Sequence, residues 1–194
     1  MNLPKRKSPR LKAYDYSTPG YYFVTICTHN KQKMFGEVVT QKACNPTVGA
    51  IHESPEKEFC ITSEVFYRLP DINYTKTGRI VDDIINHLPK RFGVTIDKYI
   101  IMPNHIHMIM IIEDNSCSRA IRESPLRSRD IIEMVVGYIK MNASKKIHKE
   151  ISKGKIWQRS FHDHIIRGEK DYQKIWQYID SNPARWKDDC LYIE

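Results

Sequence analysis

The chain has 194 residues, of which 41% are hydrophobic and 28% are charged, a composition typical of a globular protein. At this length we expect a single domain over residues 1–194. No apolar run approaches the ~18 residues of a membrane-spanning helix, and the basic N-terminus lacks the apolar segment of a secretory signal. The five cysteines are scattered, without a Cys-x-x-Cys pair, which argues against a disulfide framework or a zinc knuckle. These features predict a cytoplasmic protein with no membrane partner.

The formal net charge is +8 at pH 7, and much of it gathers in two places. The first is an N-terminal arm over residues 1–13, and the second follows a helical stretch at residues 140–155. The arm carries Lys5, Arg6, Lys7, Arg10 and Lys12, and the second group is Lys140, Lys145, Lys146, Lys149, Lys153 and Lys155. A basic surface favours polyanionic partners, nucleic acid first. Without further motifs, a solvated tail and a solvated helix face explain the same residues equally well.

The first half of the chain predicts a strand, an insertion, a helix and a hairpin. Residues 21–29 are rich in β-branched and aromatic side chains and predict a strand. Residues 40–75 contain several prolines and mixed short β patterns, such as 58–62, and predict an irregular insertion with one or two short strands. Apolar residues recur at helical spacing over 77–88. Residues 94–102 and 105–112 predict two strands joined by the turn Pro103-Asn104, the second of them central because it is almost continuously apolar.

The second half predicts a polar linker over 113–129, a helix over 130–148, an extended segment over 156–166 and a helix over 170–181. Asn182-Pro183 ends the last helix. With the insertion removed, the order is close to β-α-β-β-α-β. We therefore predict an α+β fold: a ferredoxin-like or RRM-like antiparallel sheet with helices on one side and an insertion after the first strand.

A histidine pair opens the second strand of the predicted hairpin. Because side chains alternate along a strand, His105 and His107 face the same side, and Ile106 faces the other. Two neutral imidazoles on one face can bind one divalent cation. Two ligands do not complete a metal site, and two half-exposed histidines without a ligand remain the alternative for the pair alone.

The last predicted helix offers further donors. Its core face is defined by residues at helical spacing, namely Tyr172, Ile175, Trp176 and Ile179. Tyr178 lies about 110° from the centre of that stripe, at 100° per residue. Asn182 is four residues further on, on the same side. A tyrosine and an amide are thus expected to project together, away from the core.

These residues resemble the single-tyrosine HUH transposases of simple insertion sequences, and more narrowly their REP-associated branch. The resemblance rests on segments spread over nearly the whole chain: Tyr14-Asp15-Tyr16, 20–28, Met102-Pro103-Asn104-His105-Ile106-His107, Trp157-Gln158-Arg159, 163–167, Tyr178-Ile179 and Asn182-Pro183. It is poorest over 40–75. Met108 stands where the family often has Gly, and Phe161-His162 where the branch often has an aromatic pair.

The resemblance implies an RRM-like domain that cuts single-stranded DNA, with hairpin structure in the DNA, in DNA transposition. Tyr178 matches the nucleophile, which would form a 5′-phosphotyrosine intermediate. His105 and His107 match the ligands of a divalent metal ion, Mg or Mn, and Asn182 a third polar ligand. His164 is expected to neighbour the site. The expected DNA contacts are Lys5, Arg6, Lys7, Arg10, Lys140, Trp157 and Arg159, and whether the protein is a monomer or a homodimer stays open.

Two other function classes compete with a metal-dependent nuclease and strand transferase. The first is a catalytically silent module of the same fold that binds structured DNA or RNA. The second is an unrelated metallohydrolase that uses His-x-His, as amidohydrolase barrels do, although 194 residues is short for a barrel. A third His, Asp or Glu at the metal, with no need for Tyr178, would favour the hydrolase.

Overall fold

A computed structural model describes residues 18–39, 71–88, 92, 94–113, 130–151 and 154–193. Three predicted features lie outside these residues: the basic arm with Lys5, Arg6, Lys7 and Arg10, the β pattern at 58–62, and the linker before residue 130.

The fold is built on one antiparallel sheet of four strands in the order β4-β5-β1-β6. The strands are β1 (Gly20–Cys27), β4 (Val94–Met102), β5 (His105–Ile112) and β6 (His162–Ile166). The predicted bounds of β4 and β5 are confirmed, and β5 is a central strand between β4 and β1. Only the last part of the segment 156–166 is a strand, because its beginning forms just one bridge, between Thr28 and Trp157.

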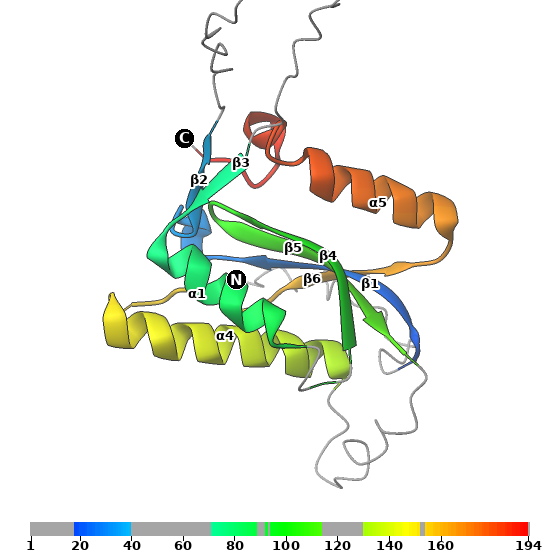
Figure 1. The fold of residues 1–194 in the computed structure, drawn as a ribbon, viewed down its shortest axis with the longest axis horizontal. Coiled ribbons are helices and arrows are strands. Elements are labelled where there is room, and N and C mark those ends of the chain that lie inside the picture. The colour runs from blue at the N-terminus through cyan, green and yellow to red at the C-terminus, as the bar shows by residue number, and fades with distance from the viewer. Residues whose placement is uncertain are drawn as a thin grey trace, which may run out of the picture.

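Within the part of the chain that the structure describes, three α-helices accompany this sheet: α1 (Lys76–Asn86), α4 (Ile131–Glu150) and α5 (Glu169–Ser181). The α+β, ferredoxin-like fold is therefore confirmed. The prediction that all helices lie on one side is wrong for the last one. Figure 1 shows α1 and α4 against one face and α5 against the other. The cause is the sequence of β5, whose two faces are both apolar, so each needs a cover.

A second, smaller sheet joins the residues just before the predicted insertion at 40–75 to the end of that insertion. Strand β2 (Gly36–Val39) pairs antiparallel with β3 (Asp71–Tyr74). Two short 3-10 helices, His29–Lys31 and Trp186–Asp188, complete the described elements. Trp186 packs with Met102 and Ile72, so the C-terminal segment is held against the end of β4 and the small sheet.

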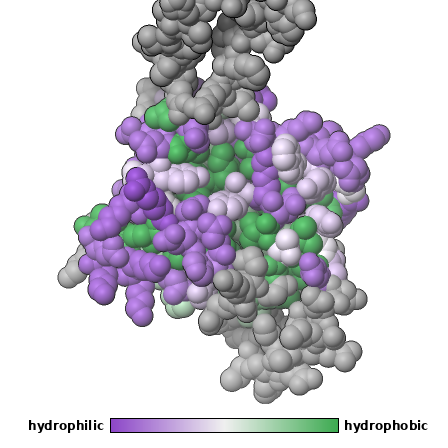
Figure 2. Space-filling view, in the orientation of Figure 1, coloured by the Kyte–Doolittle hydropathy of each residue, from purple (hydrophilic) through white to green (hydrophobic). Residues whose placement is uncertain are grey.

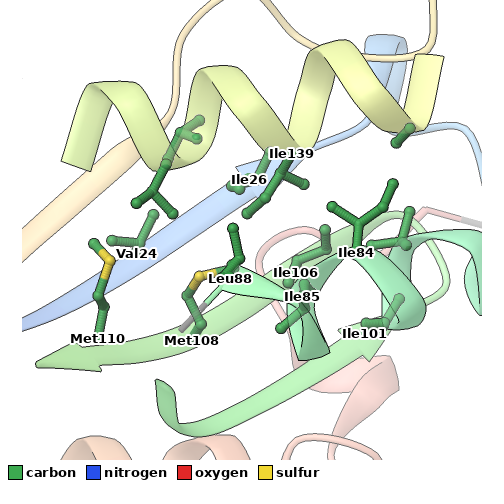
Figure 3. Packing of buried hydrophobic residues seen from close by; sticks show 14 of the residues in the cluster. Val24, Ile26, Ile84, Ile85, Leu88, Ile101, Ile106, Met108, Met110 and Ile139 are labelled. Carbon is green, nitrogen blue, oxygen red and sulfur yellow. The ribbon is translucent and has the colours of Figure 1, made fainter. Parts of the chain in front are cut away.

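The main core lies between the sheet and the helix pair α1–α4. Alternate residues of the central strands point into it, among them Val24, Ile26, Ile106, Met108 and Met110 (Figure 3). Helix α1 supplies Ile84 and Ile85, α4 supplies Ile139, and Leu88 joins them from just after the end of α1. Each fully buried aliphatic side chain contributes about 1.5–3 kcal/mol through the hydrophobic effect. This core therefore fixes which residues of β5 face the helix pair and which face α5.

Helix α5 packs on the opposite face through a narrower stripe than its periodicity predicts. Ile179 is fully buried, and Tyr172 and Ile175 pack beside it against Ile109 and Ile166. Trp176, predicted to lie on the core face, is 39% exposed. The Lys98 ammonium lies 3.1 Å from the centre of the Trp176 ring and also pairs with Asp180, so the indole meets a cation of β4 instead of the core.

The surface seen in Figure 2 is mostly hydrophilic along the outer faces of the helices, with hydrophobic residues visible between them. Among the described residues, no helix combines the length and hydropathy needed to cross a membrane. The cytoplasmic location stays a prediction.

We expect Gly78→Ala to destabilise the fold by about 3 kcal/mol, because a Cβ added at Gly78 would overlap the carbonyl oxygen of Phe35 and crowd Tyr74. Thermal unfolding monitored by circular dichroism measures the loss. Gly137→Ala is the matched control, since apart from its chain neighbours and the nearby backbone of its own helix no heavy atom lies within 4 Å of its added Cβ. The control should be neutral or stabilising by up to about 1 kcal/mol, because alanine favours a helix interior. Equal effects of the two substitutions would contradict the predicted packing of α1 on Phe35.

Candidate functional site

The two histidines of β5 lie side by side on the sheet face that α5 covers. His105 is fully buried and His107 is 3% exposed, and their ring centres are 4.4 Å apart. Ile106 points the other way, into the main core. The predicted common face of the pair is confirmed, whereas the alternative of two half-exposed histidines is wrong.

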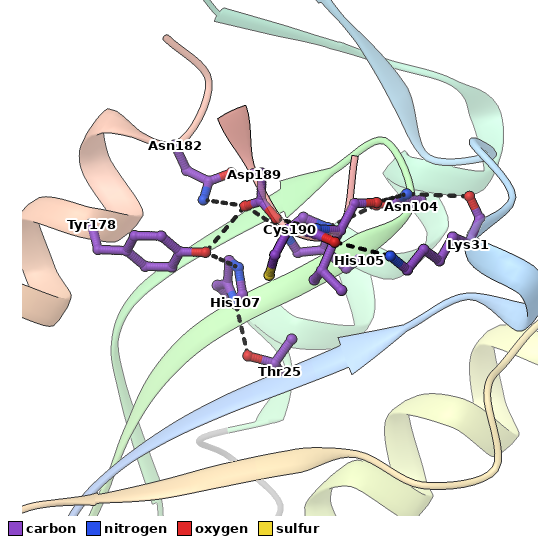
Figure 4. A network of polar contacts seen from close by, with 10 residues as sticks. Thr25, Lys31, Asn104, His105, His107, Tyr178, Asn182, Asp189 and Cys190 are labelled. Carbon is purple, nitrogen blue, oxygen red and sulfur yellow. Dashed lines mark hydrogen bonds and ion pairs between the residues drawn. The ribbon is translucent and has the colours of Figure 1, made fainter. Parts of the chain in front are cut away.

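Both imidazoles are held through Nδ1, which leaves Nε2 directed at the space under α5 (Figure 4). His105 Nδ1 lies 2.8 Å from Asn104 Oδ1, and His107 Nδ1 lies 2.8 Å from Thr25 Oγ1. An oxygen acceptor at Nδ1 stabilises the tautomer that carries its proton there, so Nε2 offers a lone pair. This arrangement is the one that histidine ligands of metal ions adopt.

Burial also keeps the two imidazoles neutral. It lowers the pKa of His105 to about 4, partly opposed by the carboxylate of Asp189. Burial, together with the neighbouring His105, holds the pKa of His107 well below its usual value. Both rings are therefore unprotonated at neutral pH and ready to act as ligands.

Tyr178 reaches the pair from α5. Its hydroxyl oxygen lies 3.2 Å from His107 Nε2 and donates to Asp189 Oδ2 at 3.1 Å. Burial, and next the charge of Asp189, raise the pKa of the Tyr178 hydroxyl. The phenol is therefore protonated, and it needs local positive charge before it can react as a phenolate.

Asn182 shares this face of α5, as predicted. Tyr178 is 38% exposed, although its hydroxyl reaches His107, whereas Asn182 does not project into solvent. Asn182 is 2% exposed, and its Nδ2 donates to Asp189 Oδ2 at 3.0 Å. The face of α5 that bears Tyr178 and Asn182 turns toward the sheet because the C-terminal segment folds back over it. Helical periodicity alone contains no information about that segment.

Asp189 is the site residue that the sequence analysis missed. It follows the 3-10 helix Trp186–Asp188, and its side chain is only 2% exposed. His105, His107 and Asp189 each offer a ligand atom, and these atoms lie within 4.8 Å of one another. Burial alone would raise the pKa of Asp189, but hydrogen bonds from the Leu191 amide and other donors lower it, so the carboxylate is ionised. Asp189 carries no motif, and only its spacing of seven residues after Asn182 could have drawn attention to it.

The polar atoms at this site are suited to binding a metal ion. Two buried polar atoms at this place, His105 Nε2 and Asn182 Oδ1, have no hydrogen-bond partner. A buried polar atom without a partner costs free energy, and a cation would satisfy both. Imidazole nitrogens with carboxylate and amide oxygens suit a divalent ion of the Mn or Zn kind, and also Mg with its preference for oxygen. The site could therefore hold a divalent metal ion.

Asn104 connects the histidine pair to the C-terminal segment. Its Oδ1 orients His105, while its Nδ2 donates to the carbonyl oxygens of Leu191 at 2.8 Å and Lys31 at 3.2 Å. Lys31 in turn donates to the Cys190 carbonyl oxygen at 2.9 Å. The segment that carries Asp189 is therefore positioned by the residue that precedes the histidines.

Other predicted site residues lie apart from this cluster. His164 lies on the edge strand β6, with Nε2 2.9 Å from Asp171, and Phe23 stands between it and His107. Lys140 donates to the carbonyl oxygens of residues 158 to 160, and burial lowers its pKa to about 8. Trp157 packs against Phe35 and is half-buried, whereas Arg159 is exposed. DNA contacts by these residues stay predictions.

The third ligand group of the cluster, Asp189, bears on the metallohydrolase alternative. Asp189 supplies the extra ligand that would favour it. The tyrosine argues in the other direction, because its hydroxyl touches both His107 and Asp189. The four-stranded sheet is also unlike a barrel. A hydrolase would need no phenol in this position.

No protein-family model matches the chain. A protein of Haemophilus influenzae without an assigned function is 32% identical over 97% of this chain and 94% of its own length. A second protein of that organism, provisionally named a REP-associated tyrosine transposase, is 28% identical over 57% of this chain and 65% of its own length. Among solved structures, a REP-associated tyrosine transposase bound to a REP hairpin superposes with a TM-score of 0.53 at 16% identity, over 91% of this chain and 74% of that one. The structural likeness supports the fold.

The ferredoxin-like sheet presents His-x-His on its central strand to a helix-borne tyrosine, the arrangement expected from the resemblance to single-tyrosine HUH proteins. The chain is similar in sequence to a relative provisionally named a REP-associated tyrosine transposase, and in fold to a solved protein of that name.

Proposed function

We propose that the protein is a transposase-like nuclease that cuts and rejoins single-stranded DNA beside a hairpin. The observation that carries the proposal is the contact of the Tyr178 hydroxyl with both His107 Nε2 and Asp189 Oδ2. This contact supports a role for Tyr178 as the nucleophile beside a candidate metal site. In support, a solved structure of a REP-associated tyrosine transposase holds a REP hairpin.

In the proposed reaction, Tyr178 Oη attacks a backbone phosphorus of the DNA. A P–Oη bond forms, the P–O3′ bond breaks, and the leaving 3′ oxygen takes up a proton. The Tyr178 proton starts in a hydrogen bond to Asp189 Oδ2, which is therefore its nearest acceptor. The products are a 5′-phosphotyrosyl link and a free 3′-hydroxyl, and the reverse reaction rejoins strands without another energy source.

His105, His107 and Asp189 would hold a divalent cation, Mg or Mn, with Asn182 Oδ1 as a further donor. A bound cation would supply Lewis-acid stabilisation of the negative charge on the phosphate oxygens. The protein's own part is to orient the nucleophile. Phe23 packs edge-on against the Tyr178 ring, and the Tyr178 hydroxyl donates to Asp189 Oδ2, which Asn182 Nδ2 also holds.

The proposal is tested by incubating the full-length protein with labelled hairpin oligonucleotides and Mn²⁺ or Mg²⁺. A covalent protein–DNA adduct on a denaturing gel is the expected result. DNA binding without an adduct for any hairpin, in either metal, would favour the catalytically silent binding module instead.

We expect Asp189→Asn to weaken Mn²⁺ binding by at least about tenfold, since it removes a charge from the ligand set but keeps its shape. Isothermal titration calorimetry of Mn²⁺ into the protein measures this without DNA or turnover. Asp188→Asn is the matched control: it removes the same charge from the exposed neighbouring residue. If both variants bind Mn²⁺ as the wild type does, Asp189 is not a ligand.

We expect DNA binding to depend strongly on salt, because cations that contact phosphates release counterions. Removing residues 1–12 should weaken binding and reduce the log–log salt slope by about 0.7 for each lost phosphate contact to single-stranded DNA. Fluorescence anisotropy over a series of salt concentrations provides the slopes. Identical slopes with and without the arm would mean that Lys5, Arg6, Lys7 and Arg10 do not contact phosphates.

A further inference from the structure

A second hollow lies on the same sheet face as the histidines, beside the first turns of α5. Its volume is about 370 Å³, against about 170 Å³ for the hollow beside Tyr178 and Asp189. Two aromatic and two aliphatic side chains, Tyr21, Tyr172, Ile111 and Ile166, form its apolar walls, and Asp97 and Glu169 add carboxylates. Pockets of ~300–1,000 Å³ with few polar groups are typical of small-molecule recognition.

A β-bulge places Asp97 at this hollow. The pairing of β4 with β5 shifts between Ile96 and Lys98, so Asp97 is an extra residue without a partner in the register. As a result, Asp97 and Lys98 both reach α5, where they contact Tyr172 and Trp176. Ile96 packs on the other face, in the main core. Bulges often re-aim a side chain beside a functional site, and this one re-aims a carboxylate.

The side chains of the hollow select the chemistry of its ligand. Tyr172 donates its hydroxyl proton to Asp97 Oδ2 at 2.7 Å, and Glu169 Oε1 accepts from Gln173. Each carboxylate has a second oxygen that can accept a proton from a ligand. No Lys, Arg or His is among the residues that line the hollow. A phosphate would therefore be repelled, whereas a flat ring with N–H donors on its edge is favoured.

We propose that this hollow binds one unpaired nucleobase of the DNA, with guanine preferred. Guanine presents N1–H and N2–H side by side, the pattern that a carboxylate such as Asp97 accepts with two hydrogen bonds, and no other DNA base offers this pair. Tyr21, which is 44% exposed and meets Tyr172 edge to face, supplies a ring for stacking. This inference rests on the DNA-binding part of the proposed function and extends it to base selection.

The position of the hollow suits a base close to the phosphate that is cut. Tyr172 and Tyr178 lie on the same helix, six residues apart, which corresponds to about 9 Å along the axis. Arg167 and Lys170 are exposed and flank Gly168 and Glu169 in the sequence, so cations stand beside the hollow where a DNA backbone would pass. The base pocket and the tyrosine can therefore act on the same single strand.

The test uses the full-length protein and fluorescently labelled single-stranded pentanucleotides with the central base varied: TTGTT, TTATT, TTCTT and TTTTT. Binding is measured by anisotropy in EDTA, so that no cleavage intervenes. We expect TTGTT to bind about 5- to 100-fold more tightly than TTTTT, the range of one good bidentate contact. Asp97→Asn should abolish this preference, because it replaces one acceptor oxygen by an N–H donor and so cannot receive N1–H and N2–H side by side, while its amide oxygen can still accept from Tyr172.

Asp83→Asn is the matched control, since it removes a carboxylate from the exposed surface of α1, on the other side of the sheet. This variant should keep the guanine preference. Equal affinity for all four probes, or a preference that survives Asp97→Asn, overturns the base pocket. If guanine preference is present and depends on Asp97 but no hairpin gives an adduct, the base pocket stands and the nuclease falls. If adducts form but no base is preferred, the nuclease stands and the base pocket falls.

Discussion

A Tyr178→Phe variant is expected to bind metal and DNA as the wild type does and to form no covalent adduct with DNA. The substitution removes one oxygen and keeps the ring, so its packing against Phe23 and His107 is retained. The lost hydrogen bonds to Asp189 and His107 should change stability by no more than about 1–2 kcal/mol. Adduct formation should fall below detection, because no other described tyrosine has its hydroxyl at the histidine pair.

Tyr138→Phe provides the control for this experiment. Tyr138 lies on α4, where its ring packs edge-on against Phe92, on the sheet face opposite the site. Tyr172→Phe is less suitable as a control because its hydroxyl contacts Asp97 at the base pocket. A labelled hairpin, Mn²⁺ and a denaturing gel compare the variants side by side. Adduct formed by Tyr178→Phe at the wild-type level would show that the nucleophile is another group.

His105→Asn and His107→Asn are expected to abolish metal-dependent cleavage and to weaken Mn²⁺ binding by more than tenfold. Asparagine places an N–H donor near the position of Nδ1, so contacts with Asn104 or Thr25 can persist while Nε2 is lost. Alanine is a poorer choice at these two positions. Both rings are buried, so truncation would leave a cavity that itself costs stability.

His148→Asn, at the exposed end of α4, is the matched control and should leave both measurements unchanged. Calorimetry with Mn²⁺ and the adduct assay give independent results, and circular dichroism reports folding. A well-folded His107→Asn variant that cleaves DNA at the wild-type rate would remove the histidines from the metal site.

Local patterns in the sequence were sufficient for most of the secondary structure. The strands at 94–102 and 105–112 have the predicted bounds, because the turn Pro103-Asn104 separates two runs of apolar and β-branched residues. The helices begin and end within two residues of the predicted positions, since their apolar spacing is clear. The common face of His105 and His107 follows from the period of two along a strand, which no tertiary contact alters.

Tertiary structure decided how the side chains of the site come together, because their arrangement depends on which surfaces of the fold meet. The helical period separates Tyr178 from the apolar stripe but cannot tell whether that side meets solvent or another segment. The fold turns it toward the histidines. Asp189 joins the site only because the C-terminal segment is held by Asn104, Lys31 and the packing of Trp186, contacts between residues more than 80 positions apart. Likewise, the bulge that aims Asp97 at the base pocket arises from the register between β4 and β5, which one strand read alone does not specify.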